Sequence, residues 1–214
     1  IRQKGETRLK AAAIVGYEDV RVFEIDKPVP GPGELLVQVK ACGVCSSELG
    51  LWLDPKFAPE RPIFFGHEVS GVVVGKGEGA HSFQLGDRVA VFTERGGYAE
   101  YVAVPERQAS RLADHIPFAW ALGEPIGCAV NGTARSGIEV GDTVVIIGVG
   151  FMGGLILQGA ALKGASRIIA VDTRPESFEV AEHRFQAEHL VQDGDPLGLR
   201  GGQVALTQFV VGEH

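Results

Sequence analysis

The sequence is poor in three features that mark common classes of protein. It has only three cysteines, Cys42, Cys45 and Cys128, too few and too unevenly spaced for a disulfide framework, so we expect a reducing, cytoplasmic compartment. No apolar run approaches the roughly 20 residues that a membrane-spanning helix needs. Basic residues number 20 against 27 acidic ones, a net charge of −7. This balance disfavours nucleic acid and anionic membranes as general partners.

Methionine is scarcer still, since Met152 is the only one, and Ile1 is therefore not expected to be the translated start. Glycine, by contrast, is abundant, with 30 residues in a composition that is 45% hydrophobic and 22% charged. This composition is typical of a globular protein with many turns and close backbone approaches.

The first half of the chain has the periodicity of short strands. Apolar alternations separated by Gly- and Pro-rich turns predict strands at 11–15, 20–24, 34–42, 68–74, 87–92 and 99–104. Many short strands with such turns favour a barrel-like β domain. We place this domain at residues 1–125.

From about residue 124 the pattern changes to alternating helices and strands. Helices are predicted at 129–136, 151–163 and 175–187, and strands at 143–147, 167–171, 189–192 and 204–211. Continuous apolar strands between helices are typical of a parallel sheet covered on both faces. The predicted fold class is therefore mixed β and α/β, with an α/β domain at residues 126–214.

A glycine-rich loop lies where a dinucleotide site needs it. Gly148, Gly150 and Gly153 form a G-x-G-x-x-G pattern, completed by Phe151 and Met152, that follows a predicted strand and opens a helix. Glycines at these positions let the backbone approach a pyrophosphate, which rests on the N–H groups of the helix end. A generic strand–helix turn is the alternative explanation.

An acidic residue, Asp172, ends the next predicted strand, 19 residues after Gly153. At this spacing a carboxylate holds the ribose 2′-hydroxyl of NAD and repels the 2′-phosphate of NADP. NAD is therefore favoured over NADP. Arg174 keeps NADP open, because it offers a cation to a phosphate if Asp172 turns away.

Cys45, His67 and Glu68 together offer a thiolate, an imidazole and a carboxylate. These ligand types are typical of an open, catalytic zinc site. Taken singly, cysteines and histidines more often pack or make hydrogen bonds. The 22 residues that separate Cys45 from His67 do not decide between these two explanations.

Taken in order, the motifs resemble the zinc-dependent medium-chain alcohol dehydrogenases, in particular the polyol dehydrogenases of the sorbitol dehydrogenase type. They are 30–34 (PGPGE), 41–45 (ACGVC), 66–71 (GHEVSG), 86–89 (GDRV), 96–101 (GGYAEY) and the glycine-rich loop. The resemblance covers residues 11 to about 192. It implies a GroES-like β-barrel catalytic domain followed by a Rossmann NAD-binding domain.

The resemblance also implies a set of metal ligands. Cys45 and His67 match the first two zinc ligands, and Glu68 matches an acid that is a ligand or an exchangeable neighbour of the metal. Glu124 stands where the third protein ligand falls, so the choice between Glu68 and Glu124 stays open. A helix-start acid is the alternative explanation for Glu124.

Two further residues match catalytic positions of the family. Ser47 matches the hydroxyl that takes the alcohol proton, with a plain surface hydroxyl as the alternative, and Glu48 matches the acid that orients the histidine ligand. Gly50 replaces a histidine that relays the proton to solvent in many relatives. The four-cysteine lobe of a structural zinc is absent. One catalytic zinc is expected, with Cys42 and Cys128 as packing residues.

The predicted function is thus an NAD- and zinc-dependent oxidation of a secondary alcohol, a polyol or sugar, by a homo-oligomer, dimer or tetramer. The chain is short for this function, because a doubly wound domain needs about six strands and residues 193–203 offer no crossover helix. We therefore expect residues to be missing within 193–203 and after His214.

The alternative is a truncated, non-catalytic member of the family that binds a nucleotide or a partner. A zinc-free reductase is disfavoured, because it does not need Cys45, His67 and Glu68 together.

Overall fold

The computed structural model describes residues 8–174, 176–177, 188–190 and 204–205. The chain divides into two compact units, residues 1–124 and 125–214, which are considered separately. Within the described part of the chain, no helix is long and apolar enough to cross a membrane.

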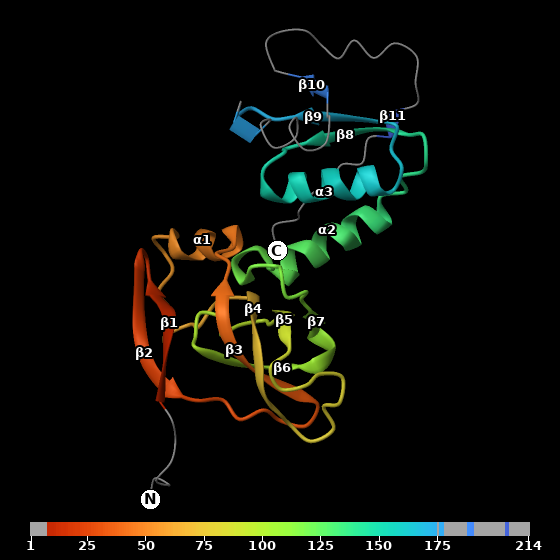
Figure 1. Ribbon diagram of the computed structural model, residues 1–214. Helices are drawn as coiled ribbons and strands as arrows, with labels where there is room; N and C mark the ends of the chain where they lie inside the picture. The colour runs from red at the N-terminus through yellow and green to blue at the C-terminus, as the bar shows by residue number, and fades with distance from the viewer. Residues whose placement is uncertain (1–7, 175, 178–187, 191–203, 206–214) are drawn as a thin grey trace, which may run out of the picture. The chain divides into compact units, whose positions relative to one another are not determined.

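The first unit is built almost entirely of antiparallel strands (Figure 1). Its elements are β1 (Arg8–Gly16), β2 (Asp19–Asp26), β3 (Glu34–Cys42), α1 (Ser46–Trp52), β4 (Glu68–Lys76), β5 (Arg88–Phe92), β6 (Tyr101–Pro105), β7 (Ala109–Arg111) and two 3-10 turns, Glu106–Gln108 and Phe118–Trp120. Strands β1 and β2 pair with each other, and the remaining strands form a sheet in the order β6-β3-β4-β5-β7. The predicted strands correspond to β1–β6, whereas β7 and α1 were not predicted.

Alternation along the strands creates the core of this unit. Val37, Val69, Val89 and Val104 are almost fully buried and belong to one apolar cluster that joins strands β3 to β6. Every second residue of a strand faces the same side of a sheet, which explains why short valine-rich alternations are sufficient to form this core. The sheet register then decides which loops meet at its ends.

The second unit is a parallel sheet with helices. Its elements are α2 (Gly123–Arg135), β8 (Thr143–Ile147), α3 (Phe151–Leu162), β9 (Arg167–Val171), β10 (Glu188–Leu190) and β11 (Val204–Ala205). The strands are parallel and lie in the order β10-β9-β8-β11. Numbered along the chain this is 3-2-1-4, the arrangement that begins a doubly wound dinucleotide-binding sheet.

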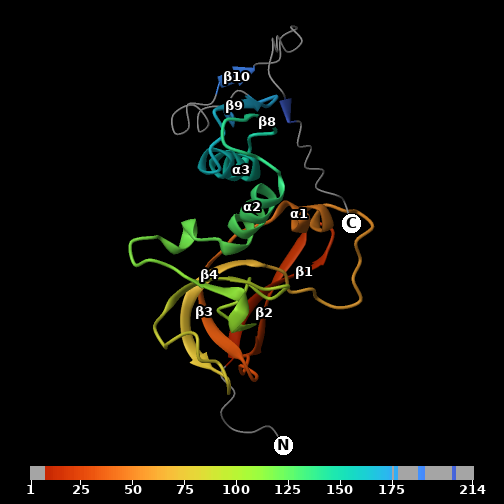
Figure 2. The same cartoon turned by 90° about the vertical axis from the view of Figure 1, so that its right-hand side faces the viewer.

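Helix α3 packs on β8 and β9, as both views show (Figures 1 and 2). Leu157 and Ala160 of α3 are fully buried and contact a cluster that contains Val144 and Ile168. Burial of one side of α3 therefore fixes the helix against strands β8 and β9.

Two predictions for the second unit need correction. Helix α2 begins at Gly123 rather than at 129, because Pro125 is tolerated in a first helical turn, where its missing N–H has no partner to lose. Cys128 is exposed on this helix, so its interpretation as a packing residue was wrong. The predicted helix 175–187, apart from residues 176–177, and most of the strand 204–211 lie outside the described residues.

Candidate metal and dinucleotide sites

The first candidate site begins at the short helix α1, which directly follows β3. Cys45 is the N-cap of this helix, and its backbone N–H donates a hydrogen bond to the Glu48 carboxylate at 3.3 Å. An acid three residues after the cap satisfies a helix-end donor and stabilises a helix too short to persist alone. Glu48 thereby holds Cys45 in place at the start of α1.

His67 and Glu68 lie at the start of β4, after a tightly packed glycine. Gly66 has φ +94°, and a Cβ there would lie 2.5 Å from the Tyr98 nitrogen. Any other residue would therefore push apart the two loops that meet here. Across this contact, the N–H groups of Gly97 and Tyr98 donate to the carbonyls of Gly66 and Phe65, at 2.9 and 3.1 Å.

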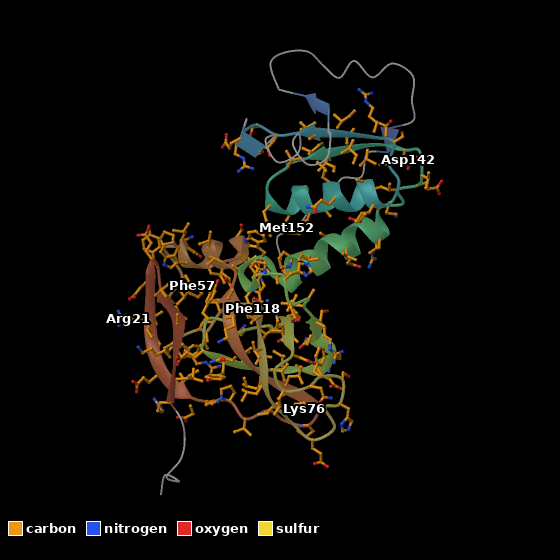
Figure 3. The ribbon with its side chains drawn as sticks, in the orientation of Figure 1. Arg21, Phe57, Lys76, Phe118, Asp142 and Met152 are labelled. Atoms are coloured by element: carbon orange, nitrogen blue, oxygen red, sulfur yellow. The ribbon has the colours of Figure 1, made fainter. Side chains whose placement is uncertain are left out.

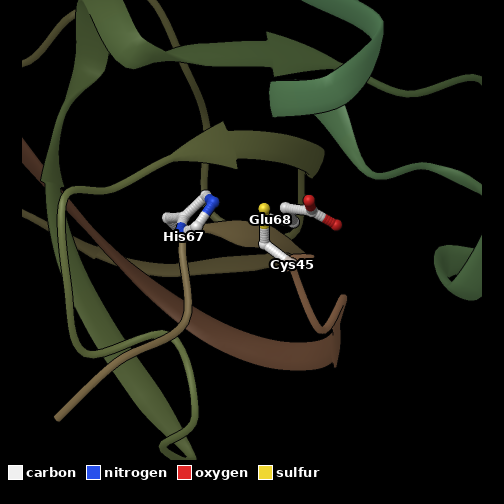
Figure 4. A group of neighbouring side chains, drawn as sticks. All are labelled: Cys45, His67 and Glu68. Carbon is white, nitrogen blue, oxygen red and sulfur yellow. The ribbon is translucent and has the colours of Figure 1, made fainter. Parts of the chain in front are cut away.

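The three predicted ligands come together in the structure. One ligand atom each from Cys45, His67 and Glu68 lies within 4.8 Å of the other two. Figure 4 shows the three side chains as neighbours. Antiparallel pairing explains the meeting, since Cys42 near the end of β3 pairs with Val69 near the start of β4. A thiolate, an imidazole and a carboxylate at one point match the donor set of a catalytic zinc site.

Glu124 lies in the first turn of α2 and is not one of these three residues. Its charge nevertheless reaches Glu68: burial raises the pKa of the Glu68 carboxyl, and the nearby Glu124 adds to the rise. A carboxyl whose charged form is disfavoured by burial and by a neighbouring acid is stabilised by a cation placed near it. The surroundings of Glu68 are therefore compatible with a metal site.

Glu48 is almost fully buried behind the cluster. Its Oε1 accepts a hydrogen bond from the Gly66 N–H at 2.7 Å and lies 3.2 Å from His67 Nδ1. With Nδ1 turned to a carboxylate, Nε2 is the ring nitrogen left for a metal. The structure therefore places Glu48 where it can orient His67.

Tyr98 completes the surroundings of Glu48 and was not predicted as a site residue. Its hydroxyl donates a hydrogen bond to Glu48 Oε2 and also lies 3.1 Å from the Gly43 carbonyl oxygen. Burial raises the pKa of the Tyr98 phenol, and the Glu48 hydrogen bond raises it further. Tyr98 is therefore a neutral donor at physiological pH.

Two other residues near the cluster behave differently. Ser47 is exposed on α1, as either a substrate-facing or a plain surface hydroxyl would be. Cys42 is half-buried, packs against the barrel core, and has its thiol pKa raised to about 12 by burial. It remains a thiol, which is a poor metal ligand.

The second candidate site is the loop between β8 and α3. Gly148 has φ +85°, and a Cβ on Gly153 would lie 1.8 Å from the Gly148 carbonyl oxygen. Gly150 is the N-cap of α3, whose first residues, Phe151 and Met152, are exposed; Figure 3 labels Met152. The loop glycines therefore bring the helix end close to the strand.

Asp172 follows β9 and binds this loop directly. Its carboxylate accepts hydrogen bonds from the Val149 N–H at 2.9 Å and from the Arg174 N–H at 2.9 Å. The Arg174 guanidinium adds contacts at 3.2 and 3.3 Å. These Arg174 hydrogen bonds hold the pKa of Asp172 well below its usual range. Arg174 thus forms an ion pair with Asp172, so the Asp172 carboxylate is not an unpaired charge.

Comparisons with known proteins identify the family of the first unit. Residues 31–114 match the family of alcohol dehydrogenase GroES-like domains. The chain is 32% identical over 210 residues to (R,R)-butanediol dehydrogenase of Bacillus subtilis. The aligned region covers 81% of this chain and 61% of the relative.

Solved structures give the same result. The crystal structure of 2R,3R-butanediol dehydrogenase from Bacillus subtilis is 30% identical with a TM-score of 0.73, over 86% of this chain and 63% of that one. A candidate zinc-binding dehydrogenase from Sinorhizobium meliloti, bound to NADP, is 30% identical with a TM-score of 0.74, over 86% and 61%. The chain spans about three fifths of the length of these relatives.

Proposed function

The chain belongs to the zinc-type alcohol dehydrogenase family, whose members combine a GroES-like domain with a Rossmann domain, and from this premise we propose its activity. The complete protein transfers hydride between a secondary alcohol, of polyol or sugar type, and NAD. The observation that carries the proposal is the meeting of Cys45, His67 and Glu68 within 4.8 Å. Residues 1–125 form the catalytic domain and residues 126–214 the NAD-binding part.

In this proposal Cys45, His67 and one glutamate, Glu68 or Glu124, hold a single catalytic zinc. Zinc, when bound, supplies a Lewis acid that lowers the pKa of an alcohol. Ser47 accepts the alcohol proton and passes it to solvent, since it is exposed.

The second unit would hold the cofactor. Gly148, Gly150 and Gly153 let the pyrophosphate approach the amino end of α3, where Phe151 and Met152 supply backbone N–H groups. Asp172 is the acid assigned to the ribose hydroxyls. The same family membership supports a cytoplasmic homo-oligomer, dimer or tetramer, which the mass in solution would test.

The proposal is tested by measuring zinc content and NAD reduction of the full-length protein on a panel of secondary alcohols, polyols and sugars. One catalytic zinc per chain with turnover on a member of the panel is the expected result. Zinc with no turnover on any of these substrates would favour the non-catalytic alternative. Turnover that survives complete removal of zinc would contradict the proposed chemistry.

The preference for NAD is a separate prediction that concerns Asp172. Asp172→Asn keeps the shape of the side chain but removes its charge, so NADP should gain on NAD. We expect the ratio of kcat/KM for NAD over NADP to fall about tenfold, the effect of roughly 1.4 kcal/mol. Because the pKa of Asp172 is held low by Arg174, its carboxylate stays ionised between pH 8 and pH 5, and titration of Asp172 should not contribute to any change in the wild-type ratio over this range.

Asp142→Asn is the matched control. Asp142 belongs to the same unit and accepts a hydrogen bond from the Glu139 N–H at 2.9 Å, but it is not part of the β8–α3 loop. Its replacement should leave the cofactor ratio unchanged. An unaltered ratio in Asp172→Asn would assign cofactor preference to other groups.

A further inference from the structure

Tyr98 lies beside the group of candidate metal ligands, on a loop that has no role in the proposed chemistry. The loop precedes β6, whereas Glu48 lies on α1, and the two residues meet through the Tyr98 hydroxyl and Glu48 Oε2. A phenol has one proton, and a carboxylate is a stronger acceptor than the Gly43 carbonyl that lies 3.1 Å away. The hydroxyl proton therefore belongs to Glu48.

The backbone holds Tyr98 in this place. A Cβ on Gly97 would lie 2.7 Å from the Gly66 carbonyl oxygen and 2.5 Å from a methyl of Val69. The absence of a side chain lets the two loops form the main-chain hydrogen bonds described above, directly beside His67. The position of Tyr98 is thus tied to the main chain that carries the histidine.

Glu48 has a divided set of partners. Oε1 accepts from Gly66 and faces His67, whereas Oε2 accepts from Cys45 and Tyr98. Of these, the Cys45 contact is the longest, at 3.3 Å. Among the residues that the structure describes, Tyr98 is the hydroxyl donor that holds the Oε2 side of the carboxylate.

The surroundings strengthen this hydrogen bond. Glu48 and Tyr98 both border a cavity of about 300 Å³, and the other residues that line it are apolar or aromatic, among them Ile14, Leu49 and Trp52. Hydrogen bonds to a charged acceptor gain strength where water is scarce. The Glu48 side chain is only 5% exposed, so little water competes with Tyr98 for Oε2.

We propose that Tyr98 is a positioning residue for the zinc site. Its hydroxyl fixes the rotation of the Glu48 carboxylate, so that Oε1 stays on His67 Nδ1 and Nε2 remains aimed at the metal. This inference rests on the proposed function, because it assumes that Cys45, His67 and a glutamate hold zinc. Without the hydroxyl, the side chains of Glu48 and His67 gain conformational freedom. This freedom is lost when the metal binds, so the affinity for zinc falls.

The test compares Tyr98→Phe with Tyr101→Phe in the full-length protein. Tyr101 is the matched control, since it lies three residues away and its hydroxyl contacts Gln38 at 3.4 Å, outside the cluster. Zinc affinity is measured by competition with a chelator, and the Co²⁺-substituted protein is followed by its visible absorption spectrum. Unfolding midpoints of the metal-free proteins are recorded alongside.

Tyr98→Phe should bind zinc 10–100-fold more weakly, the loss typical of outer-shell partners of metal ligands, and should alter the Co²⁺ spectrum. Its metal-free unfolding midpoint should also fall, because the buried Glu48 carboxylate loses a charge-assisted hydrogen bond, whereas Tyr101→Phe should stay near the wild type in both midpoint and zinc affinity. In a Glu48→Gln background the Tyr98→Phe effect should disappear, because the two residues act as a unit.

The results that would contradict this inference alone differ from the result that would also contradict the proposed function. Wild-type zinc affinity in Tyr98→Phe would overturn the inference and leave the proposed function standing. An equal loss with and without Glu48→Gln would overturn it as well, since Tyr98 would then act independently of Glu48. A wild-type protein that binds no zinc, as tested in parallel with Cys45→Ala, would overturn both.

Discussion

Replacing Cys45 with alanine should empty the proposed metal site and abolish the proposed alcohol oxidation. Cys45 supplies the thiolate of a cluster whose other members are an imidazole and a carboxylate within 4.8 Å, and two ligands do not retain zinc against four-coordinate competitors. We expect zinc affinity to fall more than the 10–100-fold that follows loss of an outer-shell partner. Metal content by mass spectrometry and NAD reduction on the best substrate would measure the two effects.

Cys42→Ala provides the control for this prediction. Cys42 is a thiol only three residues away, but it packs in the barrel core and its pKa is raised to about 12 by burial. Its replacement should cost about 1 kcal/mol of unfolding free energy through lost packing and leave zinc in place. Equal zinc loss in both variants, or full zinc content in Cys45→Ala, would show that the thiolate of Cys45 is not a ligand.

Strands with strong alternation were predictable, and the short helix was not. The bounds of β3, β8 and β9 agree with the expected ranges, because apolar residues at a strand period end there at glycine or charged residues. Helix α1 has only seven residues, too few to display a helical period. It forms because Glu48 caps it and is buried, and burial depends on the tertiary structure.

The candidate metal site could be predicted in composition but not in geometry. The types of Cys45, His67 and Glu68 indicated zinc, yet their separation along the chain contains no information on distance. The meeting of these residues follows from the pairing of β3 with β4, in which Cys42 lies opposite Val69. Register of this kind is set by the packing of the whole sheet.

The partners behind the two sites were beyond prediction for the same reason. Tyr98 belongs to a motif that enters the sequence analysis only as part of a family resemblance, and its contact with Glu48 joins a loop to helix α1. Arg174 was considered as a phosphate partner, whereas the structure pairs it with Asp172. Such contacts depend on side-chain directions that an isolated sequence pattern does not specify.

Gly153→Ala should disrupt the second unit more than its small size suggests. The added Cβ would lie 1.8 Å from the Gly148 carbonyl oxygen, a backbone atom that can move only if α3 shifts away from β8. Such overpacking costs about 1–3 kcal/mol, against a helix-propensity gain of about 1 kcal/mol. We expect a net loss of up to about 2 kcal/mol in urea unfolding and at least about tenfold weaker NAD binding by calorimetry, because a shifted α3 no longer presents its N–H groups.

Gly154→Ala separates this clash from the general effect of adding a methyl group to α3. Gly154 is the next residue of the same helix, and a Cβ there would meet nothing within 4 Å. The helix should therefore keep its place, gain up to about 1 kcal/mol from the better helix former and bind NAD as the wild type does. If Gly153→Ala were equally stable and bound NAD equally well, the close approach of strand and helix would not be what the dinucleotide site requires. Weaker NAD binding in both variants would instead show that the pocket lined by Gly150, Gly154 and Arg174 has no room for an added methyl group.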